Sequence, residues 1–283
     1  SASLTRRSAK VNRILSVTIP PEVDVNVPDQ LGALIRRALD QDGINARHAV
    51  VDVPRTQATL NTLKLPVTAP EELPNIVEIQ IAKELPFPLG EAMVDFTVAP
   101  HEPDAVSAEV LVAAVRKEMI ARYEQTISAA GLKLDRIGLR PYANKVAVER
   151  LLQHTNPERV LFIDIGPTYT EINVIRKGFL AFSRSALVNV PATFAESPIL
   201  SIVRPDADAE AFKPLELDNE ETPATRQAVV QSLLLEVTRS VEAYRGKDPG
   251  AKLDHVVIGG DSGVEEALAE AIQSRMGVTA EFL

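Results

Sequence analysis

The sequence has no cysteine among its 283 residues and only four histidines. Without cysteine, the protein can form neither disulfide bonds nor thiolate metal sites. The histidines lack the HxH or HxxxH spacing that would bring two imidazoles to one metal; they are His48, His101, His154 and His255. A zinc site is therefore not expected, and the absence of cysteine fits a reducing compartment.

Long apolar runs and an excess of basic residues are also missing. No stretch approaches the roughly 20 apolar residues of a membrane-spanning helix, and no secretory signal is visible. The net charge of −9 disfavours nonspecific binding to nucleic acid or to an anionic membrane. One basic cluster, Arg6, Arg7, Lys10 and Arg13, is interpreted as the solvated end of a strand. We expect a cytoplasmic protein whose N-terminus has been trimmed, because the chain starts with Ser inside a strand pattern.

Common catalytic motifs are absent as well. The chain contains no GxxxxGK[ST] phosphate loop, no GxGxxG fingerprint and no GxSxG nucleophile elbow. The acidic pairs Glu220-Glu221 and Glu265-Glu266 are interpreted as solvated surface rather than as acid/base pairs. Catalysis by these well-known devices is not predicted.

An α/β pattern fills the first half of the chain. Hydrophobic residues make up 45% and charged residues 24%, which is typical of a globular protein, and the length favours two subdomains. The residue periodicity first predicts a strand, a helix and two further strands, and then an α+β module followed by a return helix. The expected elements are strand 11–19, helix 31–39 closed by Gly43, strands 48–54 and 58–65, helix 71–84, strands 93–99 and 109–115, helix 117–130 closed by Gly131, and helix 135–151.

The second half begins with the sharpest local pattern of the sequence. Strand 160–165 is apolar on both faces apart from one aspartate, and with strands 170–175 and 179–186 it predicts a three-stranded meander. Residues 191–223 are rich in proline and acid and are expected to form a loop-rich subdomain. A long helix over 225–244, a strand over 255–258 and a helix opening at Ser262 complete the pattern.

The turn after strand 160–165 is the first candidate site. Asp164 ends a buried strand, where a carboxylate is costly unless it pairs with a polar group. Gly166 permits a sharp turn, and turn N–H groups with the hydroxyls of Thr168 and Thr170 can hold a phosphate or a metal-bound water. A plain β-hairpin in which Asp164 makes local hydrogen bonds explains the same residues, so both interpretations stay open.

A strand, a pair of glycines and a helix form the second candidate site. Gly259 and Gly260 would let a ligand approach the backbone, and the following helix N-terminus offers N–H groups to an anion. Ser262 and Glu265 have the spacing of a capping box. Taken alone, this motif is better explained as a tight strand–helix junction that needs small residues for packing.

Taken together, these segments resemble the actin-like ATPase superfamily, and within it the PilM/FtsA branch. DIGPTYTEINVIRKG is similar to the second phosphate hairpin of that fold, and HVVIGGDSGVEEALAEAIQSRMG to its adenosine-side strand, glycines and helix. LLLEVTRSVEAYRG, residues 233–246, resembles the helix before the final nucleotide contact. VEIQIAKELPFPLGEAMVDFTV, residues 77–98, resembles the PilM signature of a helix, a proline-phenylalanine break and an Asp-containing strand. The cytoplasmic domain of GspL-type secretion proteins is a close cousin.

The resemblance implies an actin-like (ribonuclease H-like) two-domain α/β fold with an inserted α+β subdomain of the PilM/FtsA type. Domain 1 would comprise residues 1–70 and 132–158, the insert 71–131 and domain 2 residues 159–283. Asp164, Gly166, Thr168 and Thr170 would lie near phosphate, with Asp164 holding Mg²⁺. Glu236 and Arg239 would border the nucleoside of ATP or ADP, and Gly259 and Gly260 the adenine.

The resemblance also implies a partner. PilM proteins receive a short N-terminal cytoplasmic peptide of the membrane protein PilN beside the insert, so this chain would be an adaptor of type IV pilus assembly, or of the related type II secretion system. It would lie at the inner membrane through its partners, which would include other assembly proteins, and would bind no nucleic acid.

Three departures from the family pattern weaken the expected nucleotide site. The opening phosphate hairpin, DIGxxxxK, is absent; Pro167 removes one backbone N–H from the remaining turn; and the glycine-rich segment after the meander is here LVNVPATF, residues 187–194. The acidic stretch 206–221 would also repel phosphate. A scaffold with a degenerate nucleotide site is therefore the leading hypothesis. An active actin-like ATPase or sugar-kinase-type phosphotransferase is the alternative, and an FtsA-like filament former ranks last.

Overall fold

The computed structural model describes residues 2–4, 9–11, 13–15, 17–155, 157–191, 194 and 223–283. Arg6 and Arg7, the acidic stretch 206–221 with Glu220-Glu221, and most of the expected loop-rich subdomain lie outside the described residues. The chain divides into two units. The described residues of 1–51 and 118–137 belong to the first unit, and those of 52–117, 138–196 and 221–283 to the second.

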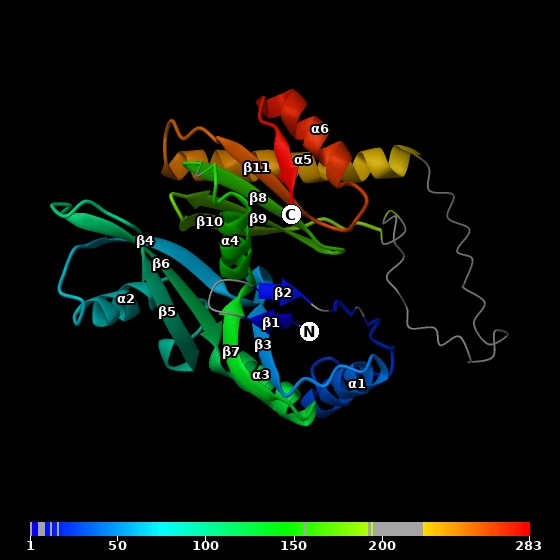
Figure 1. Ribbon diagram of the computed structural model, residues 1–283. Coiled ribbons are helices and arrows are strands. Elements are labelled where there is room, and N and C mark those ends of the chain that lie inside the picture. The colour runs from blue at the N-terminus through cyan, green and yellow to red at the C-terminus, as the bar shows by residue number, and fades with distance from the viewer. Residues whose placement is uncertain are drawn as a thin grey trace. The chain divides into compact units, whose positions relative to one another are not determined.

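The described residues of the first unit form helices and short strands (Figure 1). Helix α1 ends where Gly43 adopts a positive φ of 65°, and α3 ends before Gly131 with φ 69°, as the C-terminal glycines predict. Two strands pair as an antiparallel hairpin, and two others form a two-stranded sheet that continues into the second unit. These elements are α1 (Pro28–Gln41), α3 (Lys117–Ala129), the hairpin β1 (Ala2–Leu4) and β2 (Ala9–Val11), and the sheet β3 (His48–Val53) and β7 (Lys133–Leu139).

A five-stranded sheet of order β10-β9-β8-β11-β12 forms the centre of the second unit. Strands β8, β9 and β10 form the predicted antiparallel meander, whereas β11 runs parallel to β8. The strands are β8 (Arg159–Ile165), β9 (Tyr169–Arg176), β10 (Phe179–Leu187), β11 (His255–Gly260) and β12 (Ala280–Phe282).

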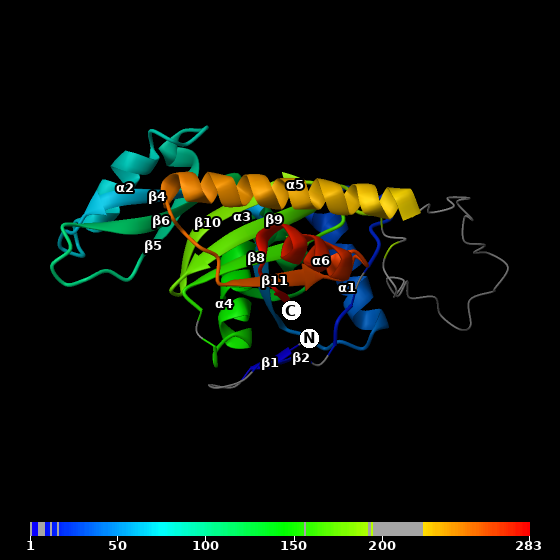
Figure 2. The same ribbon diagram turned by 90° about the horizontal axis from the view of Figure 1, so that it is seen from above.

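Helices cover both faces of this sheet. The long α5 (Pro223–Lys247) and α6 (Glu265–Met276) lie on one face, and α4 (Arg140–Leu151) lies on the other (Figure 1). Seen from above, α5 runs along the sheet with α6 beside it (Figure 2). The largest core cluster forms here, because β8 and β11 are apolar on both faces and must be covered on both.

A second, smaller core in this unit combines strand 59–66, which the sequence analysis assigns to domain 1, with elements of the predicted insert. A three-stranded antiparallel sheet of order β4-β6-β5 packs its apolar face against α2 through Leu65, Val77, Ile81 and Val112. The elements are η1 (Arg55–Gln57), β4 (Thr59–Pro66), α2 (Leu73–Ile81), η2 (Leu89–Glu91), β5 (Ala92–Val98) and β6 (Ser107–Arg116).

Two predicted elements are wrong. The helix expected over 135–151 is a strand up to Leu139 followed by α4, and Pro141 lies in the first turn of that helix. The strand expected over 11–19 ends at Val11, because residues 13–15 and 17–20 have no strand pairing. The first error concerns a segment that forms a strand by pairing with β3, far away in the sequence.

Candidate functional site

Several of the predicted site residues meet at one end of the five-stranded sheet. The carboxyl ends of β8 and β11 lie side by side, since Asp164 is opposite Gly259 and Ile165 is opposite Gly260. The β8–β9 turn then brings Gly166 and Thr170 to the same end, because Thr170 is opposite Ile165. The structure therefore brings both predicted motifs to a single edge, the position at which α/β sheets commonly bind ligands.

The turn between β8 and β9 uses its glycine for its own geometry. The Gly166 N–H donates to the Tyr169 carbonyl at 3.2 Å, and a Cβ at position 166 would lie 2.8 Å from that same oxygen. Pro167 has no N–H to offer. Of the four turn residues 166–169, only Thr168 and Tyr169 could thus direct an N–H at a phosphate.

The two threonines of the motif lie in different surroundings. Thr168 is exposed in the turn, and its carbonyl accepts the Val188 N–H at 3.1 Å. Thr170 is fully buried, and its hydroxyl lies on the sheet face that α5 covers, without a hydrogen-bond partner among the described residues. Thr170 therefore lies on the opposite face from Asp164.

Asp164 is half-buried beside the first of the two glycines. Its Oδ2 accepts a hydrogen bond from Asn144 Nδ2 of α4 at 3.1 Å, and a Cβ on Gly259 would lie 3.8 Å from its Oδ1. Asn144 was not predicted from the sequence. One oxygen of Asp164 thus holds α4, and the other faces the Gly259 backbone.

A second carboxylate, which the sequence analysis missed, lies next to Asp164. Glu171 is directly opposite Asp164 on β9 and only 4% exposed. Its Oε1 accepts the Arg55 backbone N–H at 3.0 Å. Burial, helped by the charge of Asp164, raises the pKa of Glu171, although the Arg55 N–H and the charge of Arg140 act in the opposite direction. In TEINVI, Glu171 and Asn173 alternate with Ile172 and Val174, a pattern typical of a solvated sheet face, so the local sequence did not indicate that Glu171 is buried.

The loop after β11 carries its own carboxylate. Gly260 has φ 138°, and a Cβ there would lie 2.8 Å from the Ile165 carbonyl, so glycine is required. Helix α6 begins at Glu265, whose Oε1 accepts the Ser262 N–H at 2.7 Å and the Ser262 hydroxyl at 2.6 Å. Burial alone would raise the pKa of Glu265, but these hydrogen bonds outweigh it and lower the pKa. One of the two hydrogen bonds of the predicted capping box is present. Glu265 accepts the Ser262 N–H, which is therefore not free to bind an anion.

Glu236 and Arg239 are not brought together with Asp164. Glu236 on α5 pairs with Arg184 of β10 at 2.7 Å and with Arg239 at 2.7 Å. Arg184 lies opposite Ile172, whereas Asp164 lies opposite Glu171, so the two groups face opposite sides of the sheet. Their contact with a nucleoside stays a prediction.

The residues at this edge fit a bound Mg²⁺–phosphate group only in part. Mg²⁺ is commonly held by one or two carboxylates together with phosphate oxygens and water, and Asp164 could supply such a ligand. The phosphate itself would meet few N–H donors and a second carboxylate, Glu171, on the same face. The edge thus offers a metal ligand without a full anion cradle.

A cavity lies in the first unit. It measures about 420 Å³ and is lined by aliphatic side chains of α1 and the segment before it, which offer no polar group to a nucleotide. The lining residues are Leu15, Val17, Ile19, Leu31, Leu34, Ile35, Ala38, Leu39 and Ile44. The candidate site therefore stays at the sheet edge.

Comparison with solved structures confirms the predicted actin-like α/β fold class. A chain of the "PilM-PilN type IV pilus biogenesis complex" is similar with a TM-score of 0.73 and 22% sequence identity, covering 94% of this chain and 79% of that one. The cytoplasmic domain of EpsL, an inner membrane component of the type II secretion system of Vibrio cholerae, has a TM-score of 0.40 at 16% identity, with 60% of each chain covered. A Bacteroides thetaiotaomicron protein with an actin-like ATPase fold has a TM-score of 0.43 at 7% identity, covering 89% and 76%. The last two similarities are too weak to support an argument.

No helix in the described part of the chain is long and apolar enough to cross a membrane.

The sequence itself matches the family described as "Type IV pilus assembly protein PilM" over residues 2–283. Because this match covers nearly every residue, the chain belongs to the PilM family of type IV pilus assembly proteins.

Proposed function

We propose that this protein is a scaffold of type IV pilus assembly that binds the cytoplasmic tail of a PilN-type inner-membrane protein. The family match over residues 2–283 carries the proposal. The similar fold of a chain from a PilM-PilN complex supports it. The scaffold would reach the inner membrane through this partner and through other assembly proteins.

We propose that the peptide binds beside the insert, residues 71–131, and contacts side chains that the insert exposes. Its exposed apolar side chains include Ile79 on α2, which is 62% exposed. Short cytoplasmic tails bind folded domains through a few such apolar anchors. We also propose a division of the chain into domain 1 (residues 1–70 and 132–158), this insert and domain 2 (residues 159–283).

Calorimetric titration with the N-terminal peptide of a PilN-type protein from the same genome tests the proposal. We expect saturable binding, absent for a scrambled peptide. Ile79→Asp should weaken binding at least tenfold, whereas Leu235→Asp should not, because Leu235 is a similarly exposed apolar residue on α5. Lack of binding by the unmodified protein would contradict the scaffold role, and equal weakening by both variants would contradict the assignment to the insert.

A second candidate function is an ATPase or phosphotransferase with Mg²⁺ at Asp164. The side-by-side carboxylates of Asp164 and Glu171 at the ends of strands favour it. The small number of N–H donors in the 166–169 turn opposes it. We expect nucleotide binding to be weak and turnover to be absent. Magnesium-dependent ATPase activity that Asp164→Asn abolishes would instead establish this second function.

A further inference from the structure

Four polar side chains lie together on the sheet face that α4 covers. Glu171 and Asn173 of β9 are opposite Ser185 and Ser183 of β10, so all four project from the same face. Glu171 is 4% exposed and Asn173 is 0% exposed. Helix α4 and the η1 turn pack over β9 and β10 on this side.

None of these side chains is fully satisfied. Glu171 Oε2, both amide atoms of Asn173 and the hydroxyls of Ser183 and Ser185 are buried without a hydrogen-bond partner among the described residues. An unsatisfied buried polar atom destabilises the folded state, and natural proteins avoid such groupings unless water or an ion completes them.

The spacing of the four residues suits a small bridging molecule. Directly opposite residues have Cβ atoms about 5 Å apart, and residues two apart on a strand are about 7 Å apart. A water molecule that makes two hydrogen bonds of about 2.8 Å joins polar atoms roughly 5–6 Å apart. One or two waters would therefore reach all four side chains.

The chemistry of the group distinguishes water from a cation. A cation could bind the oxygens of Glu171, the serines and the Asn173 carbonyl, but it cannot accept a hydrogen bond from Asn173 Nδ2. The half-buried Arg55 also lies over this face, where its Nε donates to the Ser183 carbonyl at 3.3 Å and its backbone N–H donates to Glu171. Water both donates and accepts, so it satisfies every atom of the group.

We infer that this face holds a buried water cluster, bound by Glu171, Asn173, Ser183 and Ser185 and covered by Arg55. The cluster continues toward the candidate site, because Glu171 is also the cross-strand neighbour of Asp164. The contact between η1 and the central sheet is then a hydrated interface rather than a dry one.

A high-resolution crystal structure of the whole chain tests the inference directly. We expect one or more fully enclosed waters within hydrogen-bond distance of Asn173 and of a serine hydroxyl. Asn173 paired directly with Ser183 or Ser185, with no enclosed density, would overturn the inference. So would a density bound by oxygens alone at the shorter distances of a metal ion.

A count of long-lived internal waters by magnetic relaxation dispersion provides a second test in solution. Removal of both hydroxyls in Ser183→Ala/Ser185→Ala should lower the count by at least one. Ser232→Ala is the matched control, since the hydroxyl of this exposed serine bonds to its own helix at Ala228. An unchanged count in the double variant would overturn the inference, and the conservative changes keep the variant foldable.

Discussion

A carboxylate inside a sheet face makes stability depend on pH. Burial raises the pKa of Glu171 in the folded protein, whereas the pKa of a glutamate in an unfolded chain is about 4.3. The folded state therefore binds the proton of the Glu171 carboxyl more tightly than the unfolded state does. Protonated Glu171 thus favours folding below about pH 4, and this contribution to stability is lost as the pH rises through the raised pKa. Glu171 acts against folding at neutral pH.

Replacement by glutamine removes this dependence and keeps an acceptor for the Arg55 N–H. We expect Glu171→Gln to be more stable than the unmodified protein at pH 7, by about 1 kcal/mol, and to lose that advantage near pH 4. Urea unfolding at several pH values measures the difference. Glu270→Gln makes the same chemical change at an exposed position and should show no such trend. A gain that is independent of pH would contradict the prediction.

Glu265 should show the opposite sign. Its hydrogen bonds from Ser262 lower its pKa, so its contribution is present above about pH 4.3 and is lost as the pH falls through the lowered value. Glu265→Ala removes this cap of α6 and should cost about 1 kcal/mol at pH 7. Thermal unfolding at pH 7 and pH 3.5 measures the cost, which should shrink at the lower pH. An equal cost at both would show that the carboxylate charge is irrelevant.

The residues of the candidate site could be predicted from the sequence where the signal is local. Asp164, Gly166, Gly259 and Gly260 stand at ends of strands, and strand pairing gathers them without any information beyond the strand pattern. Asn144 could not be found in this way, because its contact with Asp164 depends on the packing of α4 on the sheet.

At the scale of the elements, one glycine fixes how closely two helices approach. A Cβ on Gly32 of α1 would lie 2.5 Å from the Cβ of Ala129 and 2.7 Å from the Thr126 carbonyl, both in α3. Gly32→Ala must push α1 and α3 apart, and we expect it to cost about 1–3 kcal/mol in spite of the better helix propensity of alanine.

Gly246 provides the matched control for this change. It is also a helical glycine, on α5, and a Cβ there would meet no atom within 4 Å. Gly246→Ala should stabilise the protein by about 0.5–1 kcal/mol. Denaturant unfolding of both variants separates the steric effect from helix propensity. Similar behaviour of the two would mean that α1 and α3 tolerate a wider spacing.

The elements that could be predicted from the sequence are those formed by interactions between residues close together in the chain. The meander, α5 and β11 carry their periodicity and turn signals within their own residues. β7 does not, because KLDRIGL becomes a strand only by pairing with β3 about 85 residues earlier in the chain. Pro141 could have corrected the predicted start of the helix over 135–151. Proline is favoured in the first turn of a helix, so its position indicates that α4 begins near Arg140.

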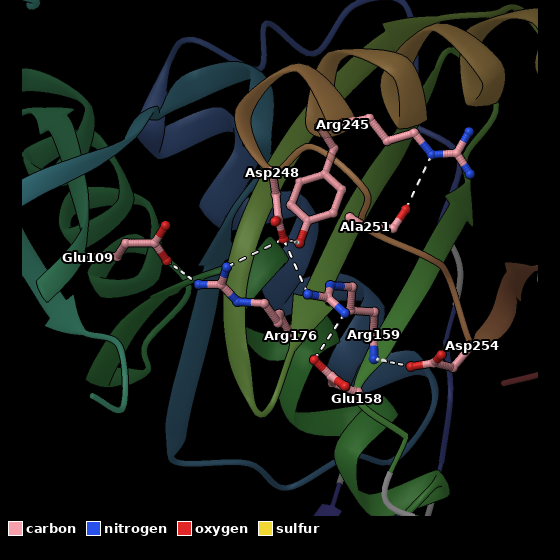
Figure 3. A network of polar contacts seen from close by, with 9 residues as sticks. Glu109, Glu158, Arg159, Arg176, Arg245, Asp248, Ala251 and Asp254 are labelled. Carbon is pink, nitrogen blue, oxygen red and sulfur yellow. Dashed lines mark hydrogen bonds and ion pairs between the residues drawn. The ribbon is translucent and has the colours of Figure 1, made fainter. Parts of the chain in front are cut away.

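At the scale of the second unit, a network of ion pairs joins the three-stranded sheet to the five-stranded one. Figure 3 shows Arg176 of β9 between Glu109 of β6 and Asp248, which follows α5. Asp248 also pairs with Arg159 of β8 at 3.4 Å and accepts the Tyr244 hydroxyl at 3.0 Å. Arg176 thus connects both sheets and the end of α5.

Truncation of this arginine should therefore loosen one sheet more than the other. In Arg176→Gln, Asp248 keeps Arg159 and Tyr244, but Glu109 loses the partner that ties β6 to β9. We expect a loss of about 2 kcal/mol, because both ion pairs of Arg176 are partly shielded from water. Hydrogen exchange should speed up in β4, β5 and β6 while β8 and β11, at the centre of the other sheet, change little.

Arg36→Gln is the control, since its ion pair with Asp40 lies within one helix turn and is worth about 0.3–0.5 kcal/mol. If exchange rises equally in both sheets, the two sheets unfold as one cooperative body, and a peptide bound to the insert would then stabilise the candidate nucleotide edge as well.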